Sequence, residues 1–247
     1  MTESVDTNMF SKSAQYYDEI YASIDKDYAA EASKAHKIIQ KYKRAKGKAL
    51  LDVACGTGFH AGLLNKYYQV EGVDLDPEML AVAKQKHPKI TFHQGDMTDF
   101  DLRRQFDAIV CLFSSIGYVK TKLRLQKAIR NMVKHLLPGG VLLIEPWFTS
   151  KQWHSGRAFM TQVNKPDLKI VRMSYSGRKG KISTIEFQYL IGTAKGIEHS
   201  AEIHELGLFT HTEYMDAFKA AGLNVTHDPE GLDGRGLYIG AKQQAKQ

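Results

Sequence analysis

The sequence predicts an α/β fold built on a doubly wound parallel sheet, for two reasons. First, short apolar runs alternate with helical stretches between residues 48 and 147, which is typical of a parallel sheet covered by helices on both faces. Second, the run KALLDVA (48–54) is followed at once by a turn with two glycines, CGTG. Rossmann-like sheets bind nucleotides at such turns, beyond the carboxyl ends of their strands.

Length and composition favour one soluble domain over residues 1–247. Hydrophobic residues make up 43% of the chain and charged residues 25%, which are ordinary proportions for a globular enzyme. No apolar run reaches the roughly 18 residues of a membrane span, and the start MTESVDTNMF lacks the features of a signal peptide. Cys55 and Cys111 lie in apolar surroundings and suit buried thiols. We therefore expect a cytoplasmic protein with no membrane partner.

The net charge of +7 raises the question of a nucleic-acid partner. The basic residues are spread along the chain, and the densest group, from Lys120 to Lys134, fits the exposed face of a helix. Because the chain has no arginine-rich tail and no alternation of basic and aromatic residues, we expect no nucleic-acid partner. A modest positive field suits a small anionic substrate such as a sugar nucleotide.

Two helices are expected before the sheet, as an N-terminal cap over residues 1–46. Apolar residues from Phe10 to Ile24 recur at spacings of three and four, which places them on one helical face. The same spacing continues from Tyr28 to Tyr42 in a second helix that ends near Gly47.

The parallel sheet is assigned from the apolar runs and the helical stretches between them. Asp76 and Pro77 mark the start of one helix, because aspartate caps a helix and proline suits its first turn. Strands are expected at 48–54, 68–74, 89–94, 106–113 and 140–147, and helices near 59–66, 77–87 and 121–136.

After Trp147 the pattern changes, and an inserted antiparallel β lid is expected at 151–208. Longer strand-like segments follow one another there through the tight turns GRKGK and GTAKG. The expected elements are strands at 168–176, 181–192 and 196–209, a helix at 211–222, and closing strands at 224–228 and 236–242.

Two glycines and two aspartates form a candidate nucleotide site. Gly56 and Gly58 have no side chain, so the backbone can approach a ligand closely and adopt a positive φ. Asp74 ends the neighbouring strand, where its carboxylate can accept both hydroxyls of a ribose. Asp52 comes just before the turn, and its carboxylate would repel a pyrophosphate and attract a cation.

Two classes of nucleoside cofactor compete for this site. The stretch GTGFHA, with Asp74 after it, fits the dinucleotide fingerprint of nicotinamide cofactors. Asp52 counts against that class, and so does a third acidic position, where Asp96 can bind an adenine amino group and Met97 can pack on its ring. The C-terminal helix and hairpin also differ from the second half of a dehydrogenase. A nicotinamide-type nucleotide-binding module remains the alternative.

The motifs LDVACGTG, VDLD, GDM, FDAIVCLF and LLPGGVLLIE resemble those of class I S-adenosylmethionine-dependent methyltransferases. The resemblance implies a seven-stranded sheet in the order 3-2-1-4-5-7-6 and S-adenosyl-L-methionine as cofactor, whose sulfonium suits Asp52. It puts the glycine turn against the methionine part, Asp74 on the ribose, and Asp96 and Met97 at the adenine. The implied cofactor-binding residues are Asp52, Ala54, Gly56, Gly58, Asp74, Leu75, Asp96, Met97 and Leu112.

A longer set of motifs is similar to the N,N-dimethyltransferases that act in amino-deoxysugar biosynthesis. These motifs are QYYDEIY, KDYAAEA, LFSSIGYV, EPWF, HELGLFTHTEY and DGRGLYIG, and the similarity extends over residues 16–240. Enzymes of that family methylate the amino group of a dTDP-linked 3-amino sugar. The resemblance implies that Tyr17 and Tyr118 lie beside the reacting amine and that Arg235 lies near the diphosphate. The implied substrate-binding residues are Tyr17, Tyr28, Glu145, Pro146, Trp147 and Arg235.

Two positions depart from that family. Ile24 stands where its members carry an arginine that helps to hold the cofactor, and Tyr118 stands where some members have histidine. Methyl transfer from a sulfonium is a direct displacement that depends on alignment and on exclusion of water. We therefore expect Tyr17 and Tyr118 to orient the amine, while bulk water or a phosphate takes its proton, without a dedicated base.

Alternatives remain for the acceptor and the partners. A methyltransferase acting on RNA, protein or another small molecule is the main alternative, suggested by the basic charge. No metal is expected, because the spacing of His199, His204 and His211 has no ligand pattern and suits structural or surface roles. Ser114 and Ser115 have no evident base partner, which argues against a nucleophilic serine. A second copy of the chain is kept as a candidate partner.

Overall fold

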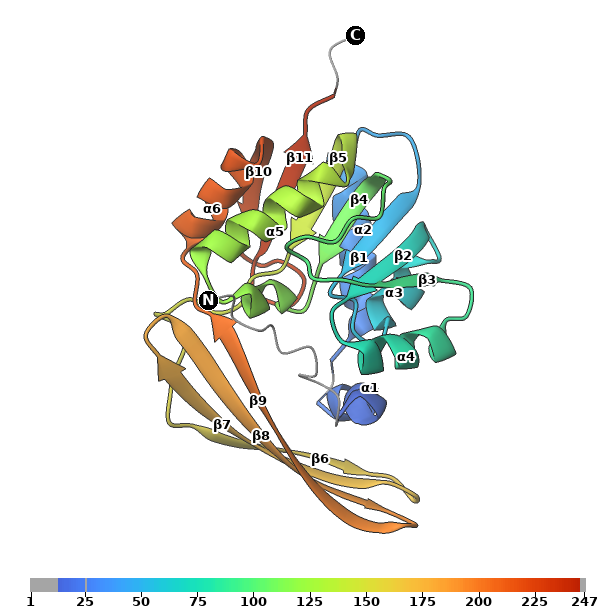
Figure 1. Cartoon of the computed structure of the whole chain (residues 1–247), viewed down its shortest axis with the longest axis vertical. Helices are drawn as coiled ribbons and strands as arrows, with labels where there is room; N and C mark the ends of the chain where they lie inside the picture. Colours follow the sequence, from blue (N-terminus) through green and yellow to red (C-terminus); the bar gives the residue numbers. More distant parts are fainter. Residues whose placement is uncertain (1–12, 25, 245–247) are drawn as a thin grey trace.

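The computed structural model describes residues 13–24 and 26–244 and contains two β-sheets (Figure 1). The larger sheet has seven strands in the order β10-β11-β5-β4-β1-β2-β3. All neighbouring strands are parallel except β10 with β11 and β11 with β5. Its strands are β1 (Ala49–Val53), β2 (Gln69–Asp74), β3 (Thr91–Gln94), β4 (Phe106–Cys111), β5 (Leu136–Ile144), β10 (Leu223–Asp228) and β11 (Leu237–Lys242). The predicted order 3-2-1-4-5-7-6 is confirmed, with β11 and β10 as its seventh and sixth strands.

Helices cover both faces of this sheet, as continuous apolar strands require. The strand residues alternate between the two cores: Leu50 and Val110 belong to one, and Leu51 and Ile109 to the other. The helices of the first core are α2 (Tyr28–Tyr42), α3 (Phe59–Leu64) and α4 (Pro77–Lys86), and those of the second are α5 (Lys122–Lys134) and α6 (His211–Ala220). No helix in the described residues is long and apolar enough to cross a membrane.

The second sheet is antiparallel and is called the lid here. It consists of β6 (Ala158–Asn164), β7 (Lys169–Lys179), β8 (Ile182–Thr193) and β9 (Gly196–Gly207). The sequence-based assignment missed β6. This strand is at the sheet edge and buries only Val163, so its sequence lacks the apolar alternation that marks a half-buried strand. In Figure 1 the lid lies below the carboxyl ends of the parallel strands.

The N-terminal segment is shorter and more broken than the predicted helix. A 3₁₀ turn, η1 (Ala14–Tyr16), leads into α1 (Tyr17–Ala22), and Phe10 lies outside the described residues. Ile24 was expected on the buried stripe, but its side chain is 47% exposed. The reason is that the helix ends at Ala22, so the stripe stops at Ile20, which packs in the apolar cluster of the lid.

Helix α1 connects the lid to the large sheet. Ile20 packs against Val163 and Ile170 of the lid. On the other side, the hydroxyl of Thr57 donates a hydrogen bond of 2.6 Å to Asp18. The helix therefore closes one side of the space between the two sheets.

Candidate functional site

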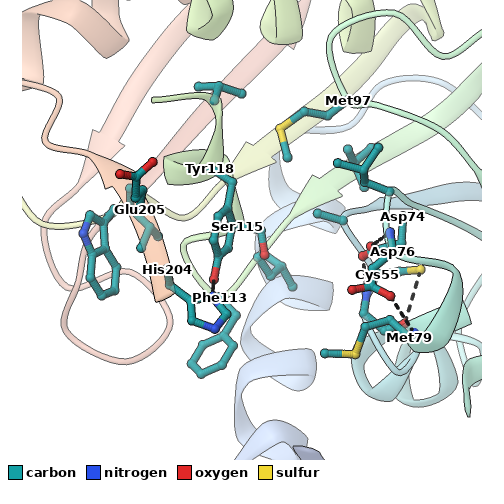
Figure 2. A pocket seen from close by; sticks show the side chains of 18 of the residues that line it. Cys55, Asp74, Asp76, Met79, Met97, Phe113, Ser115, Tyr118, His204 and Glu205 are labelled. Carbon is teal, nitrogen blue, oxygen red and sulfur yellow. Dashed lines mark hydrogen bonds between the residues drawn. The ribbon is translucent and has the colours of Figure 1, made fainter. Parts of the chain in front are cut away.

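A cavity of about 920 Å³ lies at the carboxyl ends of β1, β2 and β4, between the large sheet, α1 and the lid (Figure 2). This is the edge at which doubly wound sheets bind ligands. Its lining includes most of the predicted site residues: Tyr17, Tyr28, Asp52, Ala54, Gly56, Asp74, Leu75, Asp96, Met97, Leu112, Tyr118, Trp147 and Arg235. Gly58, Glu145 and Pro146 lie outside that lining.

The glycine turn is held by Asp74, the acid that ends the next strand. Ala54 and Gly56 both have left-handed backbone, with φ of 57° and 54°. The Gly56 N–H donates to Asp74 Oδ2 at 2.7 Å, and the Asp76 N–H donates to Asp74 Oδ1 at 2.9 Å. A side-chain carbon on Gly56 would meet no protein atom within 4 Å, so this part of the turn faces open cavity.

Asp52 and Asp74 form an acidic pair that has no cationic side-chain partner within the described part of the chain. The Asp52 residue is only 2% exposed, and its Oδ2 has no hydrogen-bond partner among the described residues. Burial, followed by the charge of Asp74, raises the pKa of Asp52 to about 8. Burial also raises the pKa of Asp74 to about 6. A ligand that brings a positive charge and hydroxyl donors would satisfy both carboxyls.

This arrangement fits S-adenosylmethionine better than a dinucleotide. The orphaned Asp52 oxygen suits a ligand with a sulfonium cation, and the lone pairs of Asp74 suit ribose hydroxyls. A pyrophosphate would add negative charge beside two buried carboxyls, where the charge of Asp74 already opposes ionisation of Asp52.

Gly58 has a different role from Gly56. It is the residue before α3, with φ of 73°. A side-chain carbon there would lie 3.0 Å from Phe92 Cζ and 3.2 Å from His87 Cδ2. Gly58 therefore permits close packing of α3 on β3 and α4, and the structure does not bring it to the cavity wall.

Asp96 is paired with Arg124, which the sequence predicts to lie on an exposed helix face. Its Oδ1 accepts the Thr98 N–H at 2.8 Å, and its Oδ2 accepts Arg124 Nη2 at 2.7 Å. Although burial opposes ionisation, these hydrogen bonds lower the pKa of Asp96. Met97 lines the same wall (Figure 2). Arg124 comes from the start of α5, and no local motif marks it.

Aromatic residues form the wall beside α1. The Tyr17 and Tyr21 ring centroids are 4.6 Å apart, and Tyr21 meets Phe113 edge to face at 5.0 Å. Burial raises the pKa of Tyr17 well above its ordinary value, so the phenol stays protonated. The Tyr28 hydroxyl is buried and has no hydrogen-bond partner among the described residues. Tyr21 and Phe113 were not predicted as site residues.

The lid supplies the opposite wall. The Tyr118 hydroxyl lies 2.9 Å from His204 Nδ1, and Figure 2 shows the two side chains pointing toward one another. The Trp147 indole donates to Ser183 Oγ at 2.9 Å. The sequence predicts a structural or surface role for His204, because its spacing to other histidines has no ligand pattern. The available signal was its strand position: residues of β9 with the same parity as Leu206 face inward.

Glu145 and Pro146 support the cavity from beneath. Glu145 is fully buried, and one carboxylate oxygen accepts the Phe113 N–H at 2.5 Å. Burial raises the pKa of Glu145 to about 8, although the Arg235 guanidinium opposes this shift. The Pro146 carbonyl accepts the Ser114 hydroxyl at 2.7 Å, and Ser114 Oγ in turn accepts Arg235 Nη1 at 3.1 Å. Both residues thus hold parts of the wall in place.

Position 24 carries no cation, but two other cationic side chains lie close to the site. Lys26 Nζ is 4.0 Å from the centroid of the Phe113 ring, and Arg235 Cζ is 5.1 Å from it. Lys26 also pairs with Glu31, and Arg235 pairs with Asp233 at 3.1 Å. Positive charge is therefore present on this side of the cavity without the arginine expected at position 24.

Comparison with known proteins gives consistent matches. The methyltransferase-domain family matches residues 50–140. The chain is 39% identical over 229 residues to the dTDP-3-amino-3,6-dideoxy-alpha-D-glucopyranose N,N-dimethyltransferase of Streptomyces fradiae, covering 92% of this chain and 89% of that one. It is 35% identical over 230 residues to the dTDP-4-amino-2,3,4,6-tetradeoxy-D-glucose N,N-dimethyltransferase of Saccharopolyspora spinosa, covering 93% and 92%.

Solved structures agree with the sequence matches. DesVI of Streptomyces venezuelae has a TM-score of 0.88 and 38% identity, covering 94% of this chain and 98% of that one. CalS10, an amino pentose methyltransferase from Micromonospora echinaspora involved in calicheamicin biosynthesis, has a TM-score of 0.83 and 35% identity, covering 93% and 97%. The CalS10 structure contains bound S-adenosylmethionine.

Proposed function

We propose, on the premise that this chain belongs to the class I S-adenosylmethionine-dependent methyltransferases, that it methylates the amino group of a dTDP-linked amino-deoxysugar. Membership of the family follows from relatives that are 35–39% identical over more than nine-tenths of the chain. The interpretation as a nicotinamide-type module is thereby wrong. The acceptor comes from the same relatives, whose names specify N,N-dimethylation of dTDP-linked amino sugars.

The observation that supports this proposal is the division of one cavity into two chemically different walls. Asp52, Asp74 and Asp96 gather on one wall, where they would hold the cofactor by its cationic part, ribose and adenine. The tyrosines, Trp147 and Arg235 form the remaining walls, which suit a sugar ring and an anionic nucleotide. When bound, S-adenosylmethionine supplies an electrophilic methyl group.

The protein's own contribution is alignment and exclusion of water. Tyr17 and Tyr118 are the residues we propose to orient the amine, and desolvation raises the pKa of both phenols well above the ordinary value, so that they remain protonated. Arg235 keeps guanidinium donors for a phosphate beyond those used on Ser114 and Asp233.

The experiment is a thermal-shift panel followed by product analysis. We expect S-adenosylhomocysteine to raise the melting temperature, and a dTDP-amino sugar to raise it further in its presence. Mass spectrometry should then detect singly and doubly methylated sugar nucleotide. Methylation of RNA or protein, with none of any sugar nucleotide, would contradict the acceptor assignment while leaving the methyltransferase assignment intact.

We further propose that a second copy of this chain packs on the outer face of the lid. Register places Met173 beside Met160, and Val171 beside Leu190, on one side of the sheet. These side chains are exposed, Met173 by 42% and Met160 by 62%. Apolar side chains gathered on one sheet face are typical of an interface, and a self-complementary sheet face suits a two-fold dimer. The other exposed apolar residues of that face are Tyr175, Ile197 and Ile203.

Light scattering tests the dimer. We expect the wild type to have twice the chain mass and Met173→Glu to be a monomer, because a charge cannot be buried in that interface without a partner. Lys195→Glu, in the exposed turn between β8 and β9, is the matched control and should remain dimeric. A monomeric wild type would contradict the proposal. A cytoplasmic location, which suits the two free buried thiols, is also part of this proposal.

A further inference from the structure

The geometry points to a proton path made by Tyr118, His204 and Glu202, which takes the proton that the acceptor amine must lose before it attacks the methyl group. This inference rests on the proposed function, since it needs an amine in the cavity. It also replaces the sequence-based expectation that bulk water or a phosphate receives the proton.

The three side chains form a continuous hydrogen-bonded chain. Tyr118 Oη lies 2.9 Å from His204 Nδ1, and His204 Nε2 lies 3.4 Å from Glu202 Oε2. Tyr118 comes from the 3₁₀ helix η2 (Ser115–Val119), which follows β4 of the large sheet. His204 and Glu202 come from lid strand β9. Because residues two apart on a strand share a face, His204 and Glu202 point the same way. The path therefore begins at the cavity wall and continues into the lid, and Figure 2 shows its first two members, Tyr118 and His204.

Tyr118 cannot act as a base alone. Burial raises the pKa of its phenol well above the ordinary value, so the hydroxyl keeps its proton at neutral pH. It can accept a proton only if it passes its own proton onward at the same time. His204 Nδ1 is the atom in position to receive it, and imidazole is the side chain that most often takes up and releases protons in enzymes.

Glu202 orients the imidazole and balances its charge. Its carboxylate also accepts hydrogen bonds from Tyr189 Oη at 3.0 Å and from the Ser13 hydroxyl at 2.9 Å. Although burial opposes ionisation, the hydrogen bonds from His204, Ser13 and Tyr189 lower the pKa of Glu202. A carboxylate held in this way favours a proton on Nε2 of the neutral ring, so that the unprotonated Nδ1 accepts the Tyr118 hydroxyl.

The groups around the path add charges of both signs. Arg172 lies over the Phe187 ring at 4.8 Å, and that ring meets His204 edge to face. The titratable and charged groups that face the path are Tyr17 and Tyr21 from α1, Asp74 at the end of β2, Lys120 after η2, Arg172 from β7, Tyr189 from β8, and Glu202 and Glu205 from β9. Glu205 is paired with Lys120 at 2.6 Å.

Proton transfer from the substrate precedes methyl transfer. The substrate ammonium gives one proton to Tyr118 Oη, while the phenolic proton passes to His204 Nδ1, so that the ring becomes an imidazolium beside the Glu202 carboxylate. The neutral amine then forms its bond to the methyl carbon as the carbon–sulfur bond breaks, with the electron pair left on sulfur. After the product leaves, the imidazolium gives its proton to water and the path is restored. A second methylation uses the same path once more.

The test compares kcat/KM between roughly pH 6 and pH 9 for the wild type, His204→Gln and Tyr118→Phe with a dTDP-amino sugar. Loss of a positioned proton acceptor reduces the rate about 10²- to 10⁴-fold, and we expect a loss in that range at pH 6. The deficit should shrink as pH rises, because the amine then loses its proton in solution. His199→Gln is the matched control: it lies on the same strand, is exposed and bonds only to Gln188 among the described residues, and it should match the wild type.

A second readout does not depend on turnover. In ¹⁵N NMR of the imidazole-labelled wild type, the path requires that the neutral ring of His204 carry its proton on Nε2. A proton on Nδ1, or a deficit that stays the same at every pH, would overturn the path, even if a variant proved unstable. If the wild type methylates no amine at any pH, the proposed function fails and the path fails with it; methylation by the wild type with equal rates for both variants overturns the path alone.

Discussion

The hydroxyl of Thr57 donates a 2.6 Å hydrogen bond to Asp18 and so fastens helix α1 to the glycine turn. Asp18 also pairs with Lys86 of α4. Tyr17 is adjacent to Asp18, and Tyr21 lies one helical turn further on. The part of the protein proposed to hold the cofactor is thus joined to the aromatic wall proposed to hold the amine.

Removal of the hydrogen bond between Thr57 and Asp18 should loosen α1 and leave the large sheet intact. We expect Thr57→Val to reduce kcat/KM about tenfold, because a hydrogen bond to a charged group contributes about 1.5–3 kcal/mol. Hydrogen exchange in Tyr17–Ala22 should rise, while exchange in β1 and β4 stays slow. Lys86→Met is the control. The Lys86 side chain is 30% exposed, so its ion pair contributes little; an equal effect of both variants would contradict the prediction.

The two glycines of the turn should respond differently to alanine. Gly56→Ala places a methyl group in open cavity and is expected to reduce stability by only about 1–2 kcal/mol, the strain of a left-handed residue. It should weaken binding of S-adenosylhomocysteine at least tenfold. Gly58→Ala carries the same strain and also crowds Phe92 and His87, so its loss of stability should be larger by about 1–3 kcal/mol. Urea denaturation and calorimetry separate the two effects; the reverse ranking of stability would contradict this assignment.

Much of the large sheet could be predicted from the sequence, because apolar continuity and glycine turns are local signals. The strand order needed the family resemblance, since pairing of β10 with β11 and of β11 with β5 depends on distant residues. The edge strand β6 escaped prediction because it buries only Val163.

The site residues also fall into two groups, those that local sequence predicts and those that it does not. Asp52, Gly56 and Asp74 are adjacent to a strand end and could be found by inspection. His204 and Arg124 could not, because each reaches the cavity only through a tertiary contact, with Tyr118 and Asp96 respectively. Local sequence carries no record of such contacts, although the strand parity of His204 could have marked it as facing inward.

Asp52 should make the unliganded protein less stable as pH rises. An ordinary aspartate has a pKa of 3.8, and burial raises that of Asp52 to about 8. The folded state therefore binds the proton more tightly than the unfolded state, so the free energy of unfolding falls between pH 4 and pH 8 and is level above. We expect Asp52→Asn to be more stable than the wild type at pH 8. The difference in free energy of unfolding between the two proteins should be up to about 4 kcal/mol larger at pH 8 than at pH 5.

Chemical denaturation at the two pH values measures this difference. Asp74 and Glu145 shift in the same direction, but they are present in both proteins, so the comparison isolates Asp52. Asp99→Asn, which removes an exposed carboxylate, serves as the control and should show no such dependence. A wild-type advantage at pH 8 would show that Asp52 is stabilised by a contact that the geometry lacks.

Substitution of Tyr28 should separate an effect on substrate binding from an effect on the stability of the fold. Its ring stacks on Phe59 with centroids 4.3 Å apart, yet its hydroxyl has no partner among the described residues. Removing an unpaired buried hydroxyl relieves its desolvation and leaves the ring contacts, so Tyr28→Phe should be as stable as the wild type or more stable by about 1 kcal/mol. If the hydroxyl serves the substrate, KM for the sugar nucleotide should rise about 5- to 30-fold while the affinity for S-adenosylhomocysteine stays within about twofold.

The same substitution at Tyr68 is the matched control. Tyr68 Oη is 3.0 Å from His36 Nδ1 and 3.0 Å from Gln40 Nε2, and the residue directly precedes β2, at the end of the strand opposite to Asp74. Tyr68→Phe leaves these partners unpaired, so it should lose about 1 kcal/mol of stability with no change in KM. Steady-state kinetics and urea denaturation on the two variants give opposite patterns if Tyr28 binds substrate. A stability loss at Tyr28 equal to that at Tyr68, with KM unchanged, would place the Tyr28 hydroxyl in the structural framework instead.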